Sequence, residues 1–526
     1  MRTLLRLKRQ RGLGLIFVIS ILALAATLVL LGSLNAASLR VERERTTREA
    51  LIKAKEALIA YAVSDPNRPG ELPCPDVNDD GKLLIGEDLI GSACASYTGR
   101  LPWVTLGIPD LRDDSGERLW YALSVDFHAN GPVTLNSNTA FRAGNSSLTI
   151  GGTQPATNVV AVVFSAGSPL QRADGVFQTR GCTVGVNCDA AFKCTTSPAS
   201  ATPKCNPVNY LDVSGGIDNA DLDRNFVSAA ESASFNDRVL AINSDDIMSL
   251  VQKRAGRALA QYLRDYYDTW QTAVAPAGVT FTGFKGFYPW AAPLTDPSAS
   301  LPGSNNTTNG QLPRSASAVV WESASSTLGT CSGVGTPQIV CTNLLALPAL
   351  GTISGRVKNV ATAFLDPPKA SDVSVTGVVV GPITQWTLNA GAQALDFSYD
   401  ATLGLLNTVT VNAPSASVWT TPAWVTTNNW LETAYYAVAP AFAINGTGSC
   451  GTCITVNNTV APNNNKQAVV VMTGRALSGQ AARPVTPPAL TTDYLESVNA
   501  PATLIFDHNL RSATFNDDPI AVRPWP

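Results

Sequence analysis

The sequence predicts an α+β protein in which a long N-terminal helix is followed by two similar heads. Each head is expected to be a helix packed on an antiparallel sheet, with long disulfide-bearing loops. Two observations support this fold class. The uncharged apolar run Leu13–Leu34 leads into Ala36–Val63, which contains neither glycine nor proline. Short strings from the first half of the chain also recur, in the same order, in the second half.

The apolar run is long enough to cross a membrane. Its residues would span the hydrocarbon core of about 30 Å as a helix that rises about 1.5 Å per residue. The segment in front of it carries basic residues and no acidic one: Arg2, Arg6, Lys8, Arg9 and Arg11. We therefore expect a transmembrane helix over 13–35, with the N-terminus in the cytoplasm and the rest of the chain delivered across the membrane.

The junction between the basic segment and the apolar run is informative. Arg11-Gly12 is followed at once by the apolar residues Leu13-Gly-Leu-Ile16. This layout resembles the prepilin leader of type IV pilins and of type II secretion pseudopilins. Strings such as Leu101-Pro-Trp103 also resemble large pilin-like proteins of this class.

The resemblance implies how the chain is processed and where it resides. Residues 1–12 would be a leader, cut between Gly12 and Leu13 by prepilin peptidase, and the new N-terminus would be methylated. The protein would be a single-pass inner-membrane protein with its bulk in the periplasm, or at the cell surface in a pilus. Its partners would be the inner membrane, prepilin peptidase, and other pilins or pseudopilins contacted through the N-terminal helix.

The chain departs from the family pattern at one position. Major subunits carry glutamate at the fifth residue of the mature chain, where this sequence has Phe17. That glutamate is thought to neutralise the N-terminal amine of a neighbouring subunit. A subunit without it is expected at the tip of a filament or in its initiation rather than in its body.

The helix continues beyond the apolar run into the first head. Leu51, Ala54, Leu58 and Tyr61 fall on one face at helical spacing and predict packing on a sheet. We expect the first pilin-like head over 36–243. A second amphipathic helix, from Ile247 to about Trp270, would open the second head.

The second head, 244–526, is predicted from paired strings. The pairs are Leu101-Pro-Trp103 with Tyr288-Pro-Trp290, Trp120-Tyr-Ala-Leu123 with Tyr435-Tyr-Ala-Val438, Ser147-Leu-Thr-Ile150 with Cys453-Ile-Thr-Val456, Val160-Ala-Val-Val-Phe164 with Ala468-Val-Val-Val-Met472, Tyr210-Leu-Asp212 with Tyr494-Leu-Glu496, and Ser232-Ala-Ser-Phe-Asn-Asp237 with Ser512-Ala-Thr-Phe-Asn-Asp517. A large insertion, rich in Ser, Thr, Asn and Gly, falls at about 295–425. Asp237 and Asp517 are interpreted as turn or strand-end residues that fix the fold.

The cysteines predict disulfide bonds, and the net charge argues against nucleic-acid binding. Ten cysteines follow the apolar run, and in an oxidising compartment disulfides are the default. Neighbour pairing is the simplest hypothesis: Cys74 with Cys94, Cys331 with Cys341, Cys450 with Cys453, and two pairs among Cys182, Cys188, Cys194 and Cys205. The net charge of −3 offers no basic surplus for nucleic acid, and none is predicted as a partner.

One segment follows the spacing of an EF-hand calcium loop. Its candidate ligands are Asp76, Asn78, Asp80, Lys82 (through its carbonyl) and Glu87, arranged around the glycine turn at Gly81. Leu84 stands at the usually polar ninth position, and Cys74-Pro75 precedes the loop where an EF-hand has a helix. The alternative is a polar turn without metal. No cofactor is required, and a structural Ca²⁺ is the one candidate.

The leading function is therefore structural. We expect a minor pilin or pseudopilin-like subunit that assembles through its N-terminal helix into a type IV pilus or a type II secretion pseudopilus. The alternative is a pilin-anchored surface adhesin that binds through the 295–425 insertion. An enzyme is not expected, since the chain has two histidines and no H-E-x-x-H, G-x-S-x-G or Walker motif. A thiol oxidoreductase at Cys450 and Cys453 is the third hypothesis.

Overall fold

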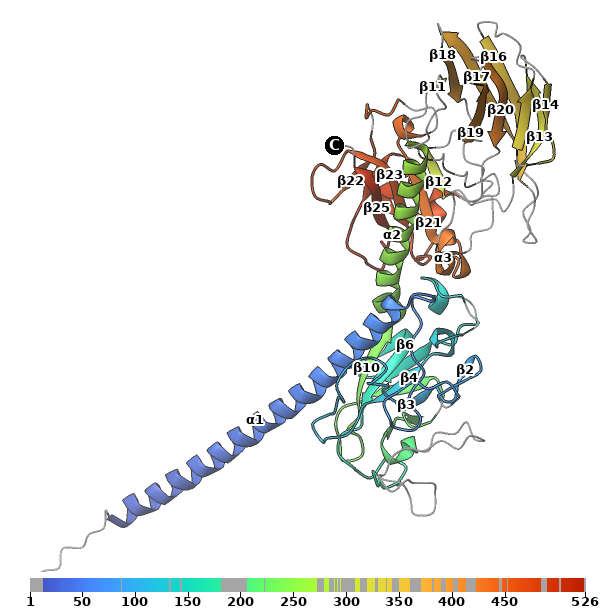
Figure 1. Ribbon diagram of the computed structural model, residues 1–526. Helices are drawn as coiled ribbons and strands as arrows, with labels where there is room; N and C mark the ends of the chain where they lie inside the picture. Colours follow the sequence, from blue (N-terminus) through green and yellow to red (C-terminus); the bar gives the residue numbers. More distant parts are fainter. Residues whose placement is uncertain are drawn as a thin grey trace, which may run out of the picture. The chain divides into compact units, whose positions relative to one another are not determined.

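The structure is a computed structural model of the chain (Figure 1). It describes the following residues: 13–86, 88–131, 134–141, 144–180, 206–221, 223–271, 279–282, 288, 291, 294, 308–312, 319–326, 330–336, 338–342, 350–359, 370–380, 383–388, 394–400, 405–412, 422–443, 447–451, 453–483, 490–500 and 503–524.

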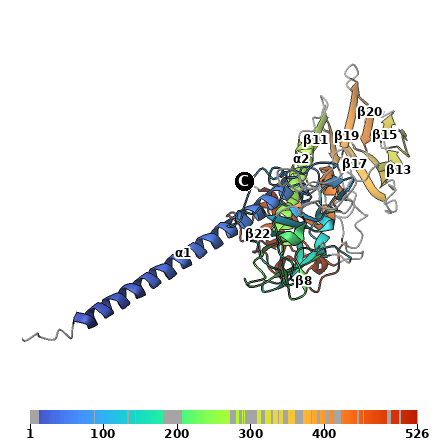
Figure 2. The same cartoon turned by 90° about the horizontal axis from the view of Figure 1, so that it is seen from below.

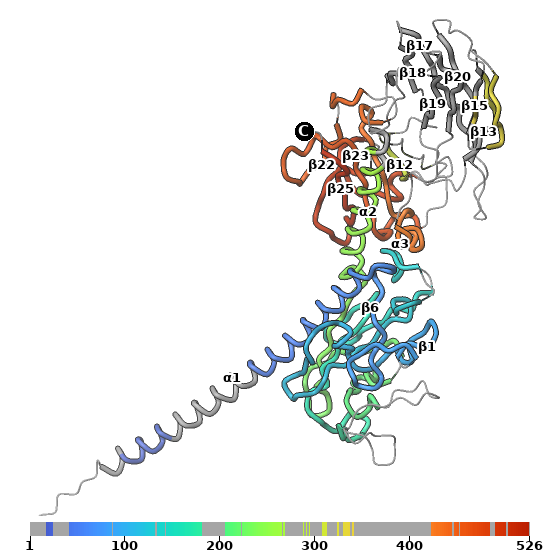
Figure 3. The backbone as a smooth tube through the Cα atoms, viewed as in Figure 1, coloured from blue at the N-terminus to red at the C-terminus, as the bar shows by residue number. Residues whose placement is uncertain are grey.

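The chain divides into two compact units, which are described separately. Unit 1 comprises residues 1–61, 72–129 and 147–242. Unit 2 comprises 62–71, 130–146 and 243–526. The boundary at 242/243 lies where strand β10 (Arg238–Asn243) leads directly into helix α2 (Ser244–Gln271), and both segments can be followed in the tube of Figure 3.

Helix α1 runs from Leu13 to Ser64 and is continuous in both views (Figures 1 and 2). Within unit 1 it buries one face, formed by Thr47, Ala50, Leu51, Ala54 and Leu58. These positions repeat every three or four residues, so they fall on one side of a helix. The opposite face is charged and exposed, with Arg45 placed between Glu42 and Glu49.

Polar contacts fix the buried face of α1 on unit 1. The Thr47 hydroxyl donates to Asp114 Oδ1 at 2.9 Å, and the Asp114 N–H donates back to the hydroxyl at 3.1 Å. Lys55 Nζ donates to the carbonyl of Ala241 on β10 at 3.1 Å. The helix is therefore part of the core of unit 1 between Thr47 and Leu58.

Unit 1 is built on a six-stranded sheet of order β3-β4-β6-β5-β9, with β10 also pairing β6. Its strands are β3 (Thr98–Arg100), β4 (Trp120–Leu123), β5 (Leu148–Gly152), β6 (Ala156–Ser165), β9 (Asn225–Ser228) and β10. All four residues of β4 are buried, and so are Val159–Ser165 of β6, because both faces of these central strands are covered. Two small hairpins accompany the sheet: β1 (Leu89–Ile90) with β2 (Ala93–Cys94), and β7 (Val213–Ser214) with β8 (Ile217–Asp218).

Unit 2 has a four-stranded sheet of order β12-β21-β23-β25 and a separate parallel pair, β22 with β24. Its strands are β12 (Asn309–Gln311), β21 (Ala434–Val438), β22 (Thr455–Asn457), β23 (Lys466–Met472), β24 (Ile505–Asp507) and β25 (Asp518–Pro524). Helix α2 packs on β23 and β25. Gly256 permits close packing there, because a Cβ at this position would overlap the side chains of Ile520 and Met472. A short helix, α3 (Ala423–Thr427), precedes β21.

The two units share strand neighbours. β4 pairs β6 antiparallel as β21 pairs β23, and β3 pairs β4 as β12 pairs β21. β6 pairs β10 as β23 pairs β25, and β5 pairs β9 in parallel as β22 pairs β24. In both units a 3-10 turn follows the equivalent strand: η1 (Val125–Phe127) follows β4, and η6 (Pro440–Phe442) follows β21.

The predicted fold class is wrong in its description of the sheets. The protein is mixed α/β with many sheets, and the pairs β5–β9 and β22–β24 are parallel rather than antiparallel, as is the pair of β11 (Val279–Thr282) with β18 (Ile383–Leu388). Strands of three to five residues are too short to show the alternation that reveals pairing partners in a sequence. Parallel partners are also joined by long connections, which no local pattern marks.

The predicted transmembrane helix over 13–35 and the single-pass inner-membrane location must be corrected as well. No helix within the described part of the chain is long and apolar enough to cross a membrane. In the apolar run, the described side chains are those of 17–24.

The predicted insertion at about 295–425 contains strands of its own. A five-stranded sheet has the order β11-β18-β17-β16-β13, and a four-stranded sheet has the order β14-β15-β20-β19. The strands are β11 (Val279–Thr282), β13 (Val319–Ser326), β14 (Thr330–Ser332), β15 (Gln338–Thr342), β16 (Leu350–Asn359), β17 (Ala370–Val380), β18 (Ile383–Leu388), β19 (Ala394–Asp400) and β20 (Leu405–Asn412). The Ser-, Thr-, Asn- and Gly-rich composition of this region, which is typical of loops, therefore did not predict its strands.

The packing of α1 on unit 1 can be tested at Leu58, whose side chain is fully buried. We expect Leu58→Ala to lower the free energy of unfolding of unit 1 by about 2–5 kcal/mol, because the cavity cannot fully collapse. Ile52→Ala is the matched control on the exposed face of the same helix and should cost about 1 kcal/mol or less. Urea unfolding followed by circular dichroism measures both. Equal losses in the two variants would contradict this packing.

Candidate functional site

Each unit contains a buried polar cluster at a corresponding place in its fold. The unit 1 cluster consists of Gln178, Arg180, Asp212, Asn219 and Asp237. The unit 2 cluster consists of Gln480, Arg483, Glu496, Asn499 and Asp517. Four members, Gln178, Asp212, Asn219 and Asp237, are at most 2% exposed in unit 1. Such groups are tolerated in a core only if they are paired.

The arginines bind backbone carbonyls in the same way in both clusters. Arg180 donates to the carbonyls of Asn209 and Tyr210 (3.0 and 2.8 Å) and to those of Ala166 and Gly167 (2.7 and 2.8 Å). Its guanidinium also lies 5.3 Å from the ring centroid of Tyr210. The arginine thus joins the end of β6 to the Tyr210 turn.

Arg483 does the same in unit 2. It donates to the carbonyls of Thr473, Gly474, Asp493 and Tyr494, and it lies 5.6 Å from the ring centroid of Tyr494. Burial lowers its pKa to about 10, and the nearby Glu496 and Asp517 oppose this effect. The guanidinium therefore stays charged at neutral pH.

The two carboxyl groups of unit 1 hold each other's backbone. Asp212 Oδ2 accepts the N–H groups of Asn236 and Asp237 at 2.6 and 3.1 Å, and Asp237 Oδ2 accepts the Asp212 N–H at 2.8 Å. Asn219 Nδ2 donates to Asp237 Oδ2 at 2.9 Å, and Gln178 Nε2 donates to Asp212 Oδ1 at 2.8 Å.

Unit 2 repeats this arrangement, with glutamate in place of the first aspartate. Glu496 Oε2 accepts the N–H groups of Asn516 and Asp517 at 3.0 and 3.1 Å, and Asp517 Oδ2 accepts the Glu496 N–H at 3.0 Å. Asn499 Nδ2 donates to Asp517 Oδ2 at 3.0 Å, and Gln480 Nε2 donates to Glu496 Oε1 at 3.0 Å.

These contacts confirm that Asp237 and Asp517 are turn residues that fix the fold. Their carboxyl groups are buried and occupied by backbone N–H groups. The roles of Arg180, Arg483, Gln178 and Gln480 in the clusters were not predicted from the sequence. Their signal in the sequence is weak: Gln178-Thr-Arg180 in one copy becomes Gln480-Ala-Ala-Arg483 in the other, so the spacing differs by one residue.

The predicted calcium loop is a tight polar turn around Asp76. Asp76 Oδ1 accepts the N–H groups of Asn78 and Asp79 at 3.0 and 2.7 Å, and Oδ2 accepts the Gly81 N–H at 2.6 Å. Burial raises the pKa of Asp76 to about 7. Asn78 and Asp80 in turn accept the N–H groups of Asp80 and Lys82 through their side-chain oxygens.

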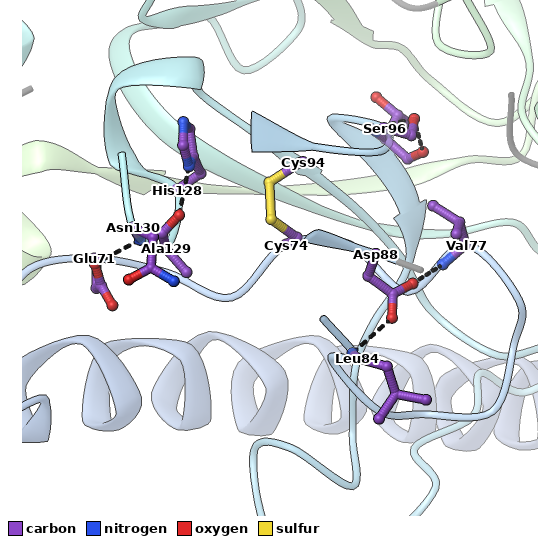
Figure 4. The surroundings of a disulfide bond; sticks show 11 residues. Glu71, Cys74, Val77, Leu84, Asp88, Cys94, Ser96, His128, Ala129 and Asn130 are labelled. Carbon is purple, nitrogen blue, oxygen red and sulfur yellow. Dashed lines mark hydrogen bonds between the residues drawn. A yellow bond between two sulfur atoms is a disulfide. The ribbon is translucent and has the colours of Figure 1, made fainter. Parts of the chain in front are cut away.

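The acidic end of the predicted loop differs from the expectation. Glu87 lies outside the described residues. The neighbouring Asp88 is fully buried and accepts the N–H groups of Val77 and Leu84, each at 2.9 Å (Figure 4). No group of three or more His, Cys, Asp or Glu side chains in the described part of the chain could hold a metal ion. The calcium site stays a prediction.

Disulfides stabilise this loop and a second one. Cys74 is bonded to Cys94 beside Asp88 (Figure 4), and Cys450 is bonded to Cys453. Cys331 is disulfide-bonded, and it faces Cys341 across the β14–β15 ladder. Cys182, Cys188, Cys194 and Cys205 lie outside the described residues.

The predicted processing site lies at the start of α1. Gly12 is outside the described residues, and Leu13 is the first residue of the helix. Beyond it, Phe17–Leu24 presents large apolar side chains to solvent: Phe17 is 69% exposed and Leu24 is 64% exposed. This exposed apolar segment of α1 is the main candidate for an interaction surface.

Comparisons with known proteins give no family. No family model, no curated protein and no solved structure matches this chain.

The arginine of a polar cluster can be tested by substitution. Lysine keeps the charge of Arg483 but cannot reach four carbonyls, so Arg483→Lys should lower the free energy of unfolding of unit 2 by about 1.5–3 kcal/mol. Arg257→Lys, at an exposed position of α2, is the matched control and should change it by about 0.5 kcal/mol or less. Thermal unfolding followed by calorimetry gives both values. No difference between the variants would show that the carbonyl contacts contribute nothing.

Proposed function

We propose that this chain is a pilin-like structural subunit, a minor pilin or pseudopilin, that assembles through α1. The machine would be a type IV pilus or a type II secretion pseudopilus, and the role a place at the tip or in initiation. The observation that carries this proposal is the exposed apolar segment of α1. Six of its eight side chains are large and apolar, and each is more than half exposed: Phe17, Val18, Ile19, Ile21, Leu22 and Leu24.

Such a surface is unfavourable in water. Burying a large apolar side chain is worth about 1.5–3 kcal/mol, so a run of them on one short segment favours any partner that covers it. The run from Leu13 to Leu34 carries no charged residue. A helix of this composition is best covered by other apolar helices, which is how subunits of the resembling family pack in a filament.

Unit 2 provides an internal comparison for this argument. Its helix α2 begins immediately after β10 and packs on a sheet with the same strand pairing as that of unit 1. A head of this type therefore folds on a helix that has no apolar extension. The exposed segment of α1 is not needed to build a head, which supports a role outside the fold of its own chain.

The continuity of α1 supports the same role. One helix runs from Leu13 to Ser64, and its buried residues between Thr47 and Leu58 belong to the core of unit 1. A partner that binds Phe17–Leu24 therefore also holds the first head, through a helix without glycine or proline between 36 and 63. No chemical turnover is part of the proposal.

The position in the filament follows from Phe17. In the resembling family the fifth mature residue of a major subunit is glutamate, which meets the N-terminal amine of a neighbour. Phe17 offers no charge for that contact. The proposed place is therefore one where this neighbour is absent, as at the tip or in the initiating complex.

N-terminal processing tests the proposal. In cells with prepilin peptidase we expect the purified protein to start at Leu13, and Gly12→Val should leave Met1 in place. Gly14→Ala, two residues further on, is the matched control and should be cut normally. Edman sequencing or mass spectrometry of the intact protein reads the N-terminus. A chain that begins at Met1 both with and without the peptidase would exclude a pilin-type subunit.

A second candidate function is a surface adhesin that binds through the insertion. The observation that favours it is that the strands between β12 and α3, together with β11, form two further sheets. In the sequence, strands β13 to β20 lie between β12 and β21, which pair directly with each other, whereas the corresponding strands β3 and β4 of unit 1 are joined by residues 101–119. Among the residues that the structure describes, the insertion is thus an added β structure without a counterpart in unit 1.

Deletion of the insertion separates the two candidates. Replacing 313–421 by a short Gly-Ser linker should leave filament assembly intact, because the described α1 contacts lie elsewhere. Filament counts by electron microscopy and attachment of cells to glass are the two readouts. Reduced attachment at an unchanged filament number supports the adhesin; unchanged attachment excludes it for that surface.

A further inference from the structure

In each polar cluster, one oxygen of the central carboxyl pair lacks a hydrogen-bond partner among the described residues. The unit 1 pair, Asp212 with Asp237, has four carboxyl oxygens, and three of them accept an N–H group: Asp212 Oδ1, Asp212 Oδ2 and Asp237 Oδ2. The fourth, Asp237 Oδ1, is buried and receives no hydrogen bond from any described residue. An ionised carboxylate oxygen in that position would be both desolvated and unpaired.

Unit 2 leaves the equivalent atom unpaired. Glu496 Oε1, Glu496 Oε2 and Asp517 Oδ2 each accept an N–H group, and Asp517 Oδ1 receives none from the described residues. The unit 2 sequence differs at the first carboxylate, which is glutamate instead of aspartate, and in the spacing before the arginine. The unpaired oxygen has nevertheless been retained at the same place.

The net charge of each cluster also favours a proton on the carboxyl pair. Each cluster contains two carboxyl groups and one guanidinium, and the guanidinium donates to backbone carbonyls, and in Arg483 also to Gln480 Oε1, rather than to the carboxyl pair. Arg180 also lies 3.9 Å from the carboxylate of Glu117, outside the pair. With both carboxyls ionised, the cluster would hold a net negative charge away from water. One proton on the pair makes the cluster neutral.

We propose that each carboxyl pair, Asp212 with Asp237 and Glu496 with Asp517, holds one proton at neutral pH, on Asp237 Oδ1 and on Asp517 Oδ1. The proton makes the carboxyl neutral and turns the unpaired oxygen into a hydroxyl. The two units thus each contain a proton-binding site, and releasing that proton weakens the turn that the pair holds together.

The electrostatic surroundings agree with this assignment. Burial raises the pKa of Asp237 well above its usual range and Asp212 raises it further, while Asn219 and Arg180 act in the opposite sense. Burial and then Glu496 raise the pKa of Asp517 in the same way. The other titratable or charged groups that face the clusters are Glu117 and Tyr210 around Arg180, Asp493 and Tyr494 around Arg483, and Arg511 near Glu496.

The direction of the pH effect follows from linkage. An aspartate in the unfolded chain loses its proton near pH 4. Above that pH the folded state binds more protons than the unfolded state, so the folded state loses stability as pH rises, until the proton leaves the folded pair. Within this window, the unfolding equilibrium constant of each unit should rise about tenfold per pH unit.

Asparagine substitutions in the full chain test the proposal. Asp237→Asn and Asp517→Asn mimic the neutral carboxyl, since each keeps one oxygen acceptor and places an NH₂ group where the hydroxyl would be. Hydrogen–deuterium exchange, corrected for the pH dependence of unstructured amides, would be followed between pH 5 and 8 in peptides from 206–243 and 490–524. Asp223→Asn, at an exposed position, is the control.

In the wild type both peptides should lose protection as pH rises. Each asparagine variant should abolish the pH dependence in its own unit and leave it in the other, and the control should change neither. If the variants keep the wild-type slopes, or if the wild type has none, the proposal is wrong. If a variant fails to fold, infrared spectroscopy of the wild type decides: protonated carboxyl absorption at pH 7 that disappears at higher pH is expected, and its absence at pH 7 overturns the proposal.

Discussion

The packing of α1 on the unit 1 sheet is the contact on which the rest of the account depends. Thr47, Ala54 and Leu58 are buried under it, while Phe17 and Leu24 of the same helix face solvent. In the proposed assembly, a helix that is buried in the head at one end and exposed and apolar at the other would place the head relative to the partner that binds it. The proposed assembly role is a consequence of this continuity, since a flexible connection would leave the head unplaced.

The same head has been built twice from different side chains. The strand pairings agree, and so do the arginine, carboxyl and amide contacts that fix the turns after β6 and β23. Asp212 corresponds to Glu496, whose extra methylene accompanies a one-residue change in the spacing between glutamine and arginine. What the two copies share is therefore the hydrogen-bond geometry around the buried pair, and the unpaired oxygen belongs to that geometry.

The recurring strings of the sequence coincide with the turns that the clusters fix. Tyr210-Leu-Asp212 and Phe235-Asn-Asp237 contain both carboxyls and the backbone N–H groups that they accept. Arg180 and Arg483 were not predicted, because they act on carbonyls of distant segments and a single arginine in a loop carries no pattern. The parallel pairs were missed because strands as short as β22 and β24 show no alternation.

The predicted calcium loop illustrates a different limit. The spacing drew attention to Asp76 and Glu87, yet in the structure Asp88 occupies the buried acceptor position beside the Cys74–Cys94 bond. A loop motif specifies alternating oxygen groups, and a polar turn that binds its own backbone uses the same alternation. The apolar run at 13–34 has a similar ambiguity, since apolar composition alone does not say what covers a helix.

Accessibility of the exposed segment of α1 tests the central claim most directly. A cysteine at Leu22 and, as control, one at Lys53 on the exposed face of the head half of α1 would be labelled with a maleimide in purified protein and in assembled filaments. The account predicts that Leu22→Cys is labelled in the free protein and protected in filaments, while Lys53→Cys reacts in both. Equal labelling of Leu22→Cys in the two states would contradict it.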